Sequence, residues 1–123
     1  MVCSKVLKTT EKVSKNKARL EVIDFHDNRI ASLADGAFDG LAGLKGLDLS
    51  LNVVSQLGSG LFDPLSSLMV LNMSDNYITS LPGRGFGSLV KLSTLDLSNN
   101  TIVDVDNAFK GRNKARTSKQ EIH

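Results

Sequence analysis

Apolar and polar positions along this chain follow a unit that recurs every 24 residues. The unit is L-x-x-L-x-L-x-x-N-x-L, in which other large apolar residues stand in for some leucines, and four copies follow one another without an insertion. A fixed period of this length is typical of a solenoid, in which each repeat buries its apolar face against its neighbours. We expect four repeats, at residues 20–43, 44–67, 68–91 and 92–109.

Within each repeat, alternation of apolar and polar residues predicts one short strand. In the segment Leu47 to Ser50, and again in Leu95 to Ser98, the leucines are expected to face inward and the other residues outward. Strands from successive repeats then form a parallel sheet on the concave face. The second half of the first three repeats carries a phenylalanine at one register, whereas Phe109 of the fourth falls one residue early. The three rings in register are expected to stack on the convex side: Phe38, Phe62 and Phe86. The fold class predicted is an α/β-type repeat, a curved solenoid with irregular or 3-10 convex loops.

An asparagine follows every predicted strand, where the chain must turn. An amide side chain can both donate and accept, so an inward-facing asparagine satisfies main-chain groups in adjacent turns. We expect a structural ladder along the solenoid rather than a binding site, formed by Asn28, Asn52, Asn76 and Asn100. Replacing Asn76 with leucine should then reduce thermal stability.

The outward-facing strand positions are the candidate binding surface. They hold the residues Asp24, His26, Asp48, Ser50, Asn72, Ser74, Asp96 and Ser98, with Tyr77 on the rim. One column carries acidic residues in three of four repeats, and neighbouring carboxylates attract cations. The functional hypothesis is a negative stripe that receives a basic segment of a protein partner. The alternative is that these aspartates are solvated and simply suit this strand.

Three single features have competing interpretations. Tyr77 combines a rigid ring with a polar tip, as interface anchors do, but it also suits an ordinary loop. His26 lies near Asp24 and Asp27 in the sequence, and the three could bind a metal weakly. An exposed polar residue without that role is favoured, so we expect no bound metal. Two glycosylation sequons begin at Asn72 and Asn99, and a glycan at Asn72 would obstruct the concave face.

Charge is divided unevenly along the chain. Residues 1–19 carry six basic residues and one acidic residue, and residues 110–123 carry five and one, whereas residues 20–109 carry four and eleven. We interpret the ends as a basic N-terminal segment, or an improvised cap built on Val2, Val6, Leu7 and Val13, and a basic, disordered tail. No aromatic residue lies among these lysines to stack on bases, so no nucleic acid partner is expected.

The sequence lacks the motifs that are typical of several functional classes. The sequence has no phosphate-binding loop, no G-x-S-x-G and no H-E-x-x-H, so we expect neither an enzyme nor a cofactor. The sequence has no run of 18 apolar residues, so we expect no membrane span in it. The first residues lack an apolar stretch and are not expected to form a signal peptide. Cys3 is the only cysteine, which excludes an internal disulfide.

The repeat resembles the leucine-rich repeat in its 24-residue form, and about ninety residues carry the resemblance. This form is similar to the ectodomains of Toll-like receptors, Slit proteins and small leucine-rich proteoglycans. The resemblance implies recognition of protein or other macromolecular ligands and an extracellular setting. Those ectodomains use cysteine-rich caps, which this sequence lacks, so the chain is interpreted as a fragment of a longer protein or as an uncapped module.

Three functional hypotheses follow, all of them non-enzymatic. The leading one is a ligand-recognition segment of an extracellular receptor or secreted immune-type protein. The second is an intracellular scaffold or regulator, supported by the missing signal peptide and cysteines, which would place the chain in the cytoplasm. The third is a structural matrix component. Uncapped ends also predict end-to-end self-association.

Overall fold

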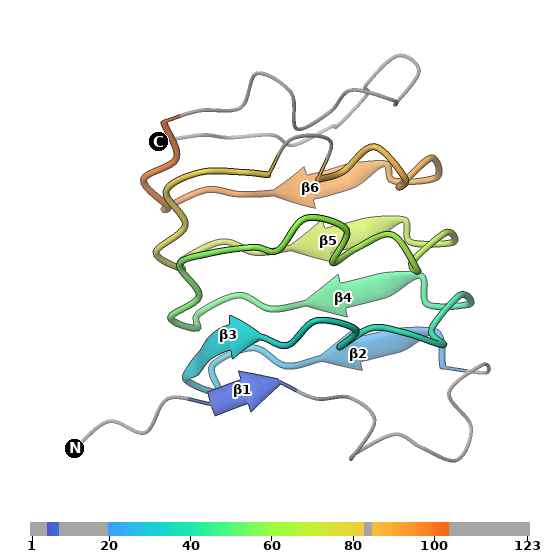
Figure 1. Ribbon diagram of the computed structural model, residues 1–123, viewed down its shortest axis with the longest axis horizontal. Helices are drawn as coiled ribbons and strands as arrows, with labels where there is room; N and C mark the ends of the chain where they lie inside the picture. The colour runs from blue at the N-terminus through green and yellow to red at the C-terminus, as the bar shows by residue number, and fades with distance from the viewer. Residues whose placement is uncertain (1–4, 8–19, 83–84, 104–123) are drawn as a thin grey trace.

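The computed structural model describes residues 5–7, 20–82 and 85–103, and it forms a stack of similar coils (Figure 1). Each coil contributes one three-residue strand to a parallel sheet. The strands, in their order in the sheet, are β2 (Val22–Asp24), β4 (Gly46–Asp48), β5 (Val70–Asn72) and β6 (Thr94–Asp96). Chain order and sheet order agree, which confirms the solenoid predicted from the period.

The 24-residue period sets the register of this sheet. Leu47 of β4 lies opposite Ile23 of β2 and Leu71 of β5, and Leu71 lies opposite Leu95 of β6. These central residues are buried, whereas their neighbours along each strand are partly or fully exposed. Successive side chains in a strand point to opposite sides, so one side of the sheet faces the core and the other faces solvent. We call the solvent side the sheet face; it is the surface that the sequence analysis calls concave.

A spine of phenylalanine rings fills the core of the stack. Phe62 lies between Phe38 and Phe86, with ring centroids 5.9 and 5.6 Å apart and ring planes within 17° of parallel. All three rings are buried together with the leucines of the repeat. Stacking at this distance adds a specific contact to the burial of a large apolar surface, so the first three repeats are joined to one another through their interior.

The inward-facing asparagines link the repeats in the way expected of a ladder. Asn76 Oδ1 accepts from the Val54 N–H at 3.0 Å, and its Nδ2 donates to the carbonyls of Leu49, Met73 and Ser74 at 3.0 to 3.1 Å. Asn52 and Asn100 make the corresponding bonds one repeat earlier and one later. Asn28, in the first repeat, is only half-buried, and its Nδ2 donates to the His26 carbonyl.

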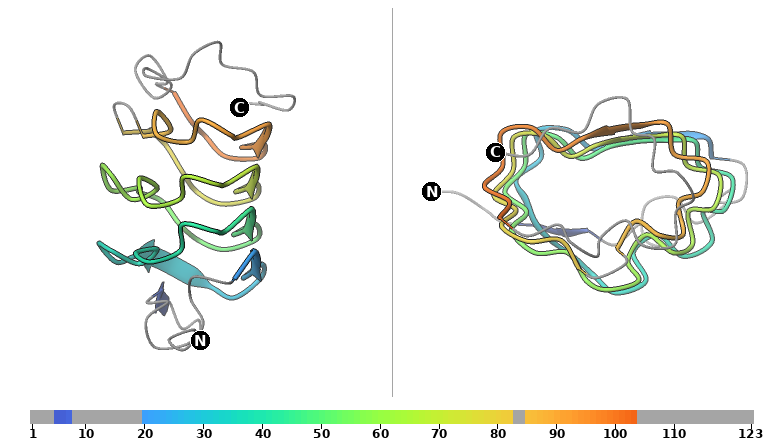
Figure 2. Two further views of the ribbon diagram at one scale, coloured as in Figure 1. Left: turned by 90° about the vertical axis from the view of Figure 1, so that its right-hand side faces the viewer. Right: turned by 90° about the horizontal axis from the view of Figure 1, so that it is seen from above.

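A second, two-stranded sheet was not anticipated from the sequence. Strand β1 (Lys5–Leu7) pairs in parallel with β3 (Ile30–Leu33), with an irregular register between Lys5 and Val6. Seen along the stack, β1 lies on the wall opposite the four-stranded sheet (Figure 2). The N-terminal segment therefore contributes a strand beside the first repeat. The rest of 1–19, with Cys3, Val2 and Val13, and the predicted tail 110–123 lie outside the described residues, as does the end of the fourth repeat after Val103.

Candidate functional site

The sheet face consists of two rows of side chains that run across the four strands. Because of the strand register, the first row contains Val22, Gly46, Val70 and Thr94, one from each strand. The second row contains Asp24, Asp48, Asn72 and Asp96, the column that the sequence analysis singled out. We call these the apolar row and the acidic row.

Each residue of the acidic row also shapes the turn that follows its strand. Asp48 Oδ1 accepts from the Ser50 main-chain N–H at 2.9 Å and from its hydroxyl at 2.6 Å. Asn72 Oδ1 makes the same two bonds with Ser74, at 3.0 and 2.8 Å. A side-chain oxygen that accepts from the N–H two residues ahead is typical of Asx turns. Since Asn72 forms the turn as well as Asp48 does, the turn needs an oxygen and not a negative charge.

The hydroxyls of the serines in these turns are engaged in hydrogen bonds within the fold. Ser50 and Ser74 are each only 7% exposed, and their hydroxyls donate to Asp48 and Asn72. Ser98 is half-buried and donates to Asp96 at 2.6 Å. The expectation that Ser50 and Ser74 are exposed is therefore wrong, because each hydroxyl is drawn to the acceptor two residues earlier. A role of these serines in binding stays a prediction.

His26 occupies the serine position of the first repeat and forms an exposed hydrogen bond with Asp24, which is an ion pair when the imidazole is protonated. Its Nδ1 lies 2.6 Å from Asp24 Oδ1, and its main-chain N–H donates to the same oxygen at 3.1 Å. The side-chain hydrogen bond is the main cause that lowers the pKa of Asp24 and raises the pKa of His26. Asp24, His26 and Asp48 each offer one side-chain atom that could bind a metal ion, and these three atoms lie within 4.8 Å of one another. The structure therefore groups His26 with Asp24 and Asp48, whereas the sequence had suggested Asp24 and Asp27.

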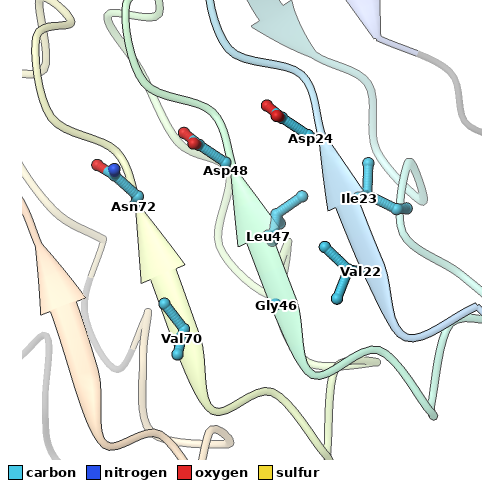
Figure 3. Close-up of a pocket in the computed structure, with 8 residues that line it drawn as sticks. All are labelled: Val22, Ile23, Asp24, Gly46, Leu47, Asp48, Val70 and Asn72. Atoms are coloured by element: carbon cyan, nitrogen blue, oxygen red, sulfur yellow. The ribbon is translucent and has the colours of Figure 1, made fainter.

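A hollow on the sheet face was missed by the sequence analysis. It has a volume of about 250 Å³ and is centred on β4 (Figure 3). The apolar row forms one end, with Val22 and Val70 on either side of Gly46. The acidic row, with Asp24, Asp48 and Asn72, forms the other end, and Ile23 and Leu47 complete the lining. The signal in the sequence was the glycine at a register where the other repeats carry valine or threonine.

In the turns beside the sheet, two large side chains are exposed, Leu51 and Tyr77. Leu51 is 52% exposed and adopts a φ of 57°, while the equivalent positions in the other repeats carry Asp27, Asp75 and Asn99 with similar φ values. Aspartate and asparagine tolerate this left-handed conformation better than leucine does, so Leu51 raises the conformational energy of its turn. Tyr77, on the next repeat, is 63% exposed, in line with its expected place on the rim.

The two sequon asparagines lie in different surroundings. Asn72 is half-buried on the sheet face, and its Oδ1 is engaged by Ser74. Asn99 is exposed in the turn after β6, with a φ of 58°. Glycosylation of either residue stays a prediction.

The geometry defines a class: a repeat solenoid whose parallel sheet displays two rows of side chains on an open surface. Residues 18–78, 54–102 and 66–116 each match the family model described as leucine-rich repeat, and the chain belongs to that family. Within the described residues, no helix has the length and apolar character needed to cross a membrane.

Solved structures share the fold. A chain in the crystal structure of the LRIM1/APL1C complex matches 86% of this chain with a TM-score of 0.78 and 25% sequence identity. The leucine-rich repeat domain of APL1B matches 85% with a TM-score of 0.72 and 24% identity. The chain spans 20% and 30% of the lengths of those two chains. No curated protein shows a significant match to the sequence.

Proposed function

We propose that this chain is a non-enzymatic recognition module that binds a protein partner through its sheet face, and that the partner presents a basic segment to the acidic row. Leucine-rich repeats are typically protein-interaction folds, and solenoids offer extended surfaces for binding. One observation carries the choice of partner. The turn after each strand works equally well with an amide, yet three of the four positions carry a carboxylate.

The surplus charge of the acidic row has a physical consequence. Partners of opposite charge are steered toward such a surface, and the attraction fixes which segment docks there. Asp24, Asp48 and Asp96 lie on a sheet whose strands are spaced about 4.8 Å apart. A peptide that crosses the strands and carries several basic residues can place a positive charge near each of these carboxylates.

The wider context is proposed from the resemblance. The chain is taken as a segment of an extracellular receptor or secreted protein of the Toll-like kind, with roles in signalling and immunity. The structural match to a chain of the LRIM1/APL1C complex, whose name states an assembly of two proteins, supports a protein partner. An intracellular scaffold and a matrix component remain the alternatives, and glycan at Asn72 or Asn99 would favour an extracellular setting over the scaffold.

Neutralising the acidic row tests the proposal. The triple variant D24N/D48N/D96N keeps every side-chain oxygen that the turns use, so it is expected to fold as the parent does. The probe is a blocked peptide of alternating lysine and serine, measured by fluorescence anisotropy at low and high salt. Because each exposed ion pair contributes about 0.5 kcal/mol, we expect about tenfold weaker binding at low salt and little difference at high salt.

The matched control is D35N/D39N/D63N, which makes the same change in charge in loops outside the sheet. Asp63 accepts from Ser88 Oγ at 2.7 Å, and asparagine retains that acceptor. Equal weakening by both triple variants would mean that net charge, and not the acidic row, attracts the peptide. Undiminished binding to D24N/D48N/D96N would overturn the proposal.

A further inference from the structure

Gly46 is a glycine that the main chain does not require. It lies in the middle of the apolar row on β4, and its φ is not in the left-handed region that favours glycine. A Cβ atom built there would meet the two Val22 methyl groups at 3.7 and 3.9 Å, which are ordinary contacts. Glycine inside a strand costs about 0.5 to 1 kcal/mol relative to alanine. The fold therefore pays a small cost for the missing side chain and gains nothing from it in packing.

What the missing side chain creates is the hollow between Val22 and Val70, which we call the Gly46 notch. These two valines are 69% and 44% exposed, so the notch has apolar walls open to solvent. The valine in the row on either side shows that a side chain is compatible with this position of the sheet. Exposed apolar walls are unfavourable in water unless a ligand covers them.

The notch is apolar at one end and negatively charged at the other. Residues two apart in a strand lie on the same side of the sheet and are separated by about 6.6 Å. Asp24 therefore lies about that far from Val22 along β2, and Asp48 about that far from Gly46 along β4. Figure 3 shows Asp24, Asp48 and Asn72 side by side at that end, with Val22 and Val70 at the other. The side chains of lysine and arginine are complementary to this notch, because each has a long apolar stem that ends in a positive charge.

We propose that the Gly46 notch receives one lysine or arginine side chain of the bound partner, with its stem between Val22 and Val70 and its charge between Asp24 and Asp48. The proposal rests on the proposed function, because it names the group that the same face selects. It adds a requirement that the acidic row alone does not impose: the charge must be carried on a long stem. A short ammonium side chain would satisfy the carboxylates and leave the valines uncovered.

Two peptides distinguish the notch from simple charge attraction. One is the blocked lysine–serine peptide, and the other replaces every lysine with 2,4-diaminobutyric acid, which keeps the ammonium on a stem of two methylenes instead of four. Burial of each methylene favours binding by up to a factor of about four, so partial burial predicts about fivefold tighter binding of the lysine peptide to the parent protein.

The variant G46V fills the notch with the side chain found in the neighbouring repeats, Val22 and Val70. It should fold, because those repeats carry valine at the same register, and an unchanged or higher Tm would establish this. We expect G46V to lose the fivefold preference while still binding both peptides through the acidic row. The matched control is G58V, at an exposed glycine outside the sheet where a Cβ atom also meets only an ordinary contact, 3.6 Å from Asp35 Oδ1.

The outcomes separate the two proposals. Equal affinity of the parent for both peptides, or a preference that survives in G46V, would overturn the notch and leave the acidic row in place. Loss of the preference in G58V as well would also overturn it. If the parent binds neither peptide, the proposed function fails and the notch fails with it.

Discussion

At the scale of single residues, the sheet face separates what the fold needs from what it displays. The oxygen of Asp48 holds the turn by accepting from Ser50, and the amide of Asn72 does the same for Ser74. The charge of Asp48, the open space at Gly46 and the exposed ring of Tyr77 have no such part in the described structure. We assign these features to recognition because the fold is complete without them.

The ion pair of His26 makes this surface sensitive to pH. The charged groups that raise the pKa of His26 are Asp24, Asp48 and Asp27, with the Asp24 hydrogen bond the largest cause. At a pH below that raised value, His26 is positive and opposes a basic ligand at Asp24. At a higher pH His26 is neutral and no longer opposes the ligand.

We therefore expect the lysine–serine peptide to bind a few-fold more tightly at about pH 8 than at about pH 6, a range in which histidine titrates and lysine does not. The measurement is a series of anisotropy titrations at constant ionic strength. The variant H26Q should bind with nearly constant affinity across this range. A pH dependence that is unchanged in H26Q would show that another group controls it.

At the scale of elements, the strands are stabilised mainly by hydrogen bonds between repeats. Each strand has three residues, which is too short to be stable alone. Asn76 joins main-chain groups of two successive repeats, from Val54 and Leu49 to Met73 and Ser74. A ladder position inside the stack should therefore matter more than one at its first coil.

The pair N76L and N28L tests this gradient. Removing the Asn76 amide leaves one N–H and three carbonyls without this partner, all four of them buried, and each such group costs about 1 to 3 kcal/mol. We expect N76L to lower the free energy of unfolding by at least about 3 kcal/mol and the half-buried Asn28 to contribute about 1 kcal/mol. Urea denaturation followed by circular dichroism measures both. Equal, small losses for the two variants would refute a structural ladder.

At the scale of the whole molecule, the sequence period was enough to predict the stack, because side chains 24 residues apart meet in the core. Leu47, Leu71 and Leu95 are buried at one register as predicted. The pairing of β1 with β3 escaped prediction because Lys5–Leu7 does not follow the repeat, and main-chain pairing leaves little trace in side-chain pattern. Whether this segment caps the stack, and whether the stacks associate end to end, stay predictions.

The candidate site was predicted in its location but not in its depth. The acidic row follows from the alternation of the strand, so Asp24, Asp48 and Asp96 were found. Alternation also assigned Ser50 and Ser74 to the surface, since it does not register that a turn begins there and pulls the hydroxyls toward Asp48 and Asn72. The Gly46 notch is a missing side chain, which becomes a hollow only when Val22 and Val70 are placed on either side of it.

The central claim is that ligands bind on the sheet face, and a map of the contact surface tests it most directly. Two-dimensional amide NMR spectra of the labelled protein would be recorded during titration with the lysine–serine peptide. We predict that the largest shift changes occur at Val22–Asp24, Gly46–Asp48 and Val70–Asn72, with small changes around Phe38, Phe62 and Phe86. Largest changes in the loops that surround the phenylalanine spine would place binding on the opposite side and contradict the account.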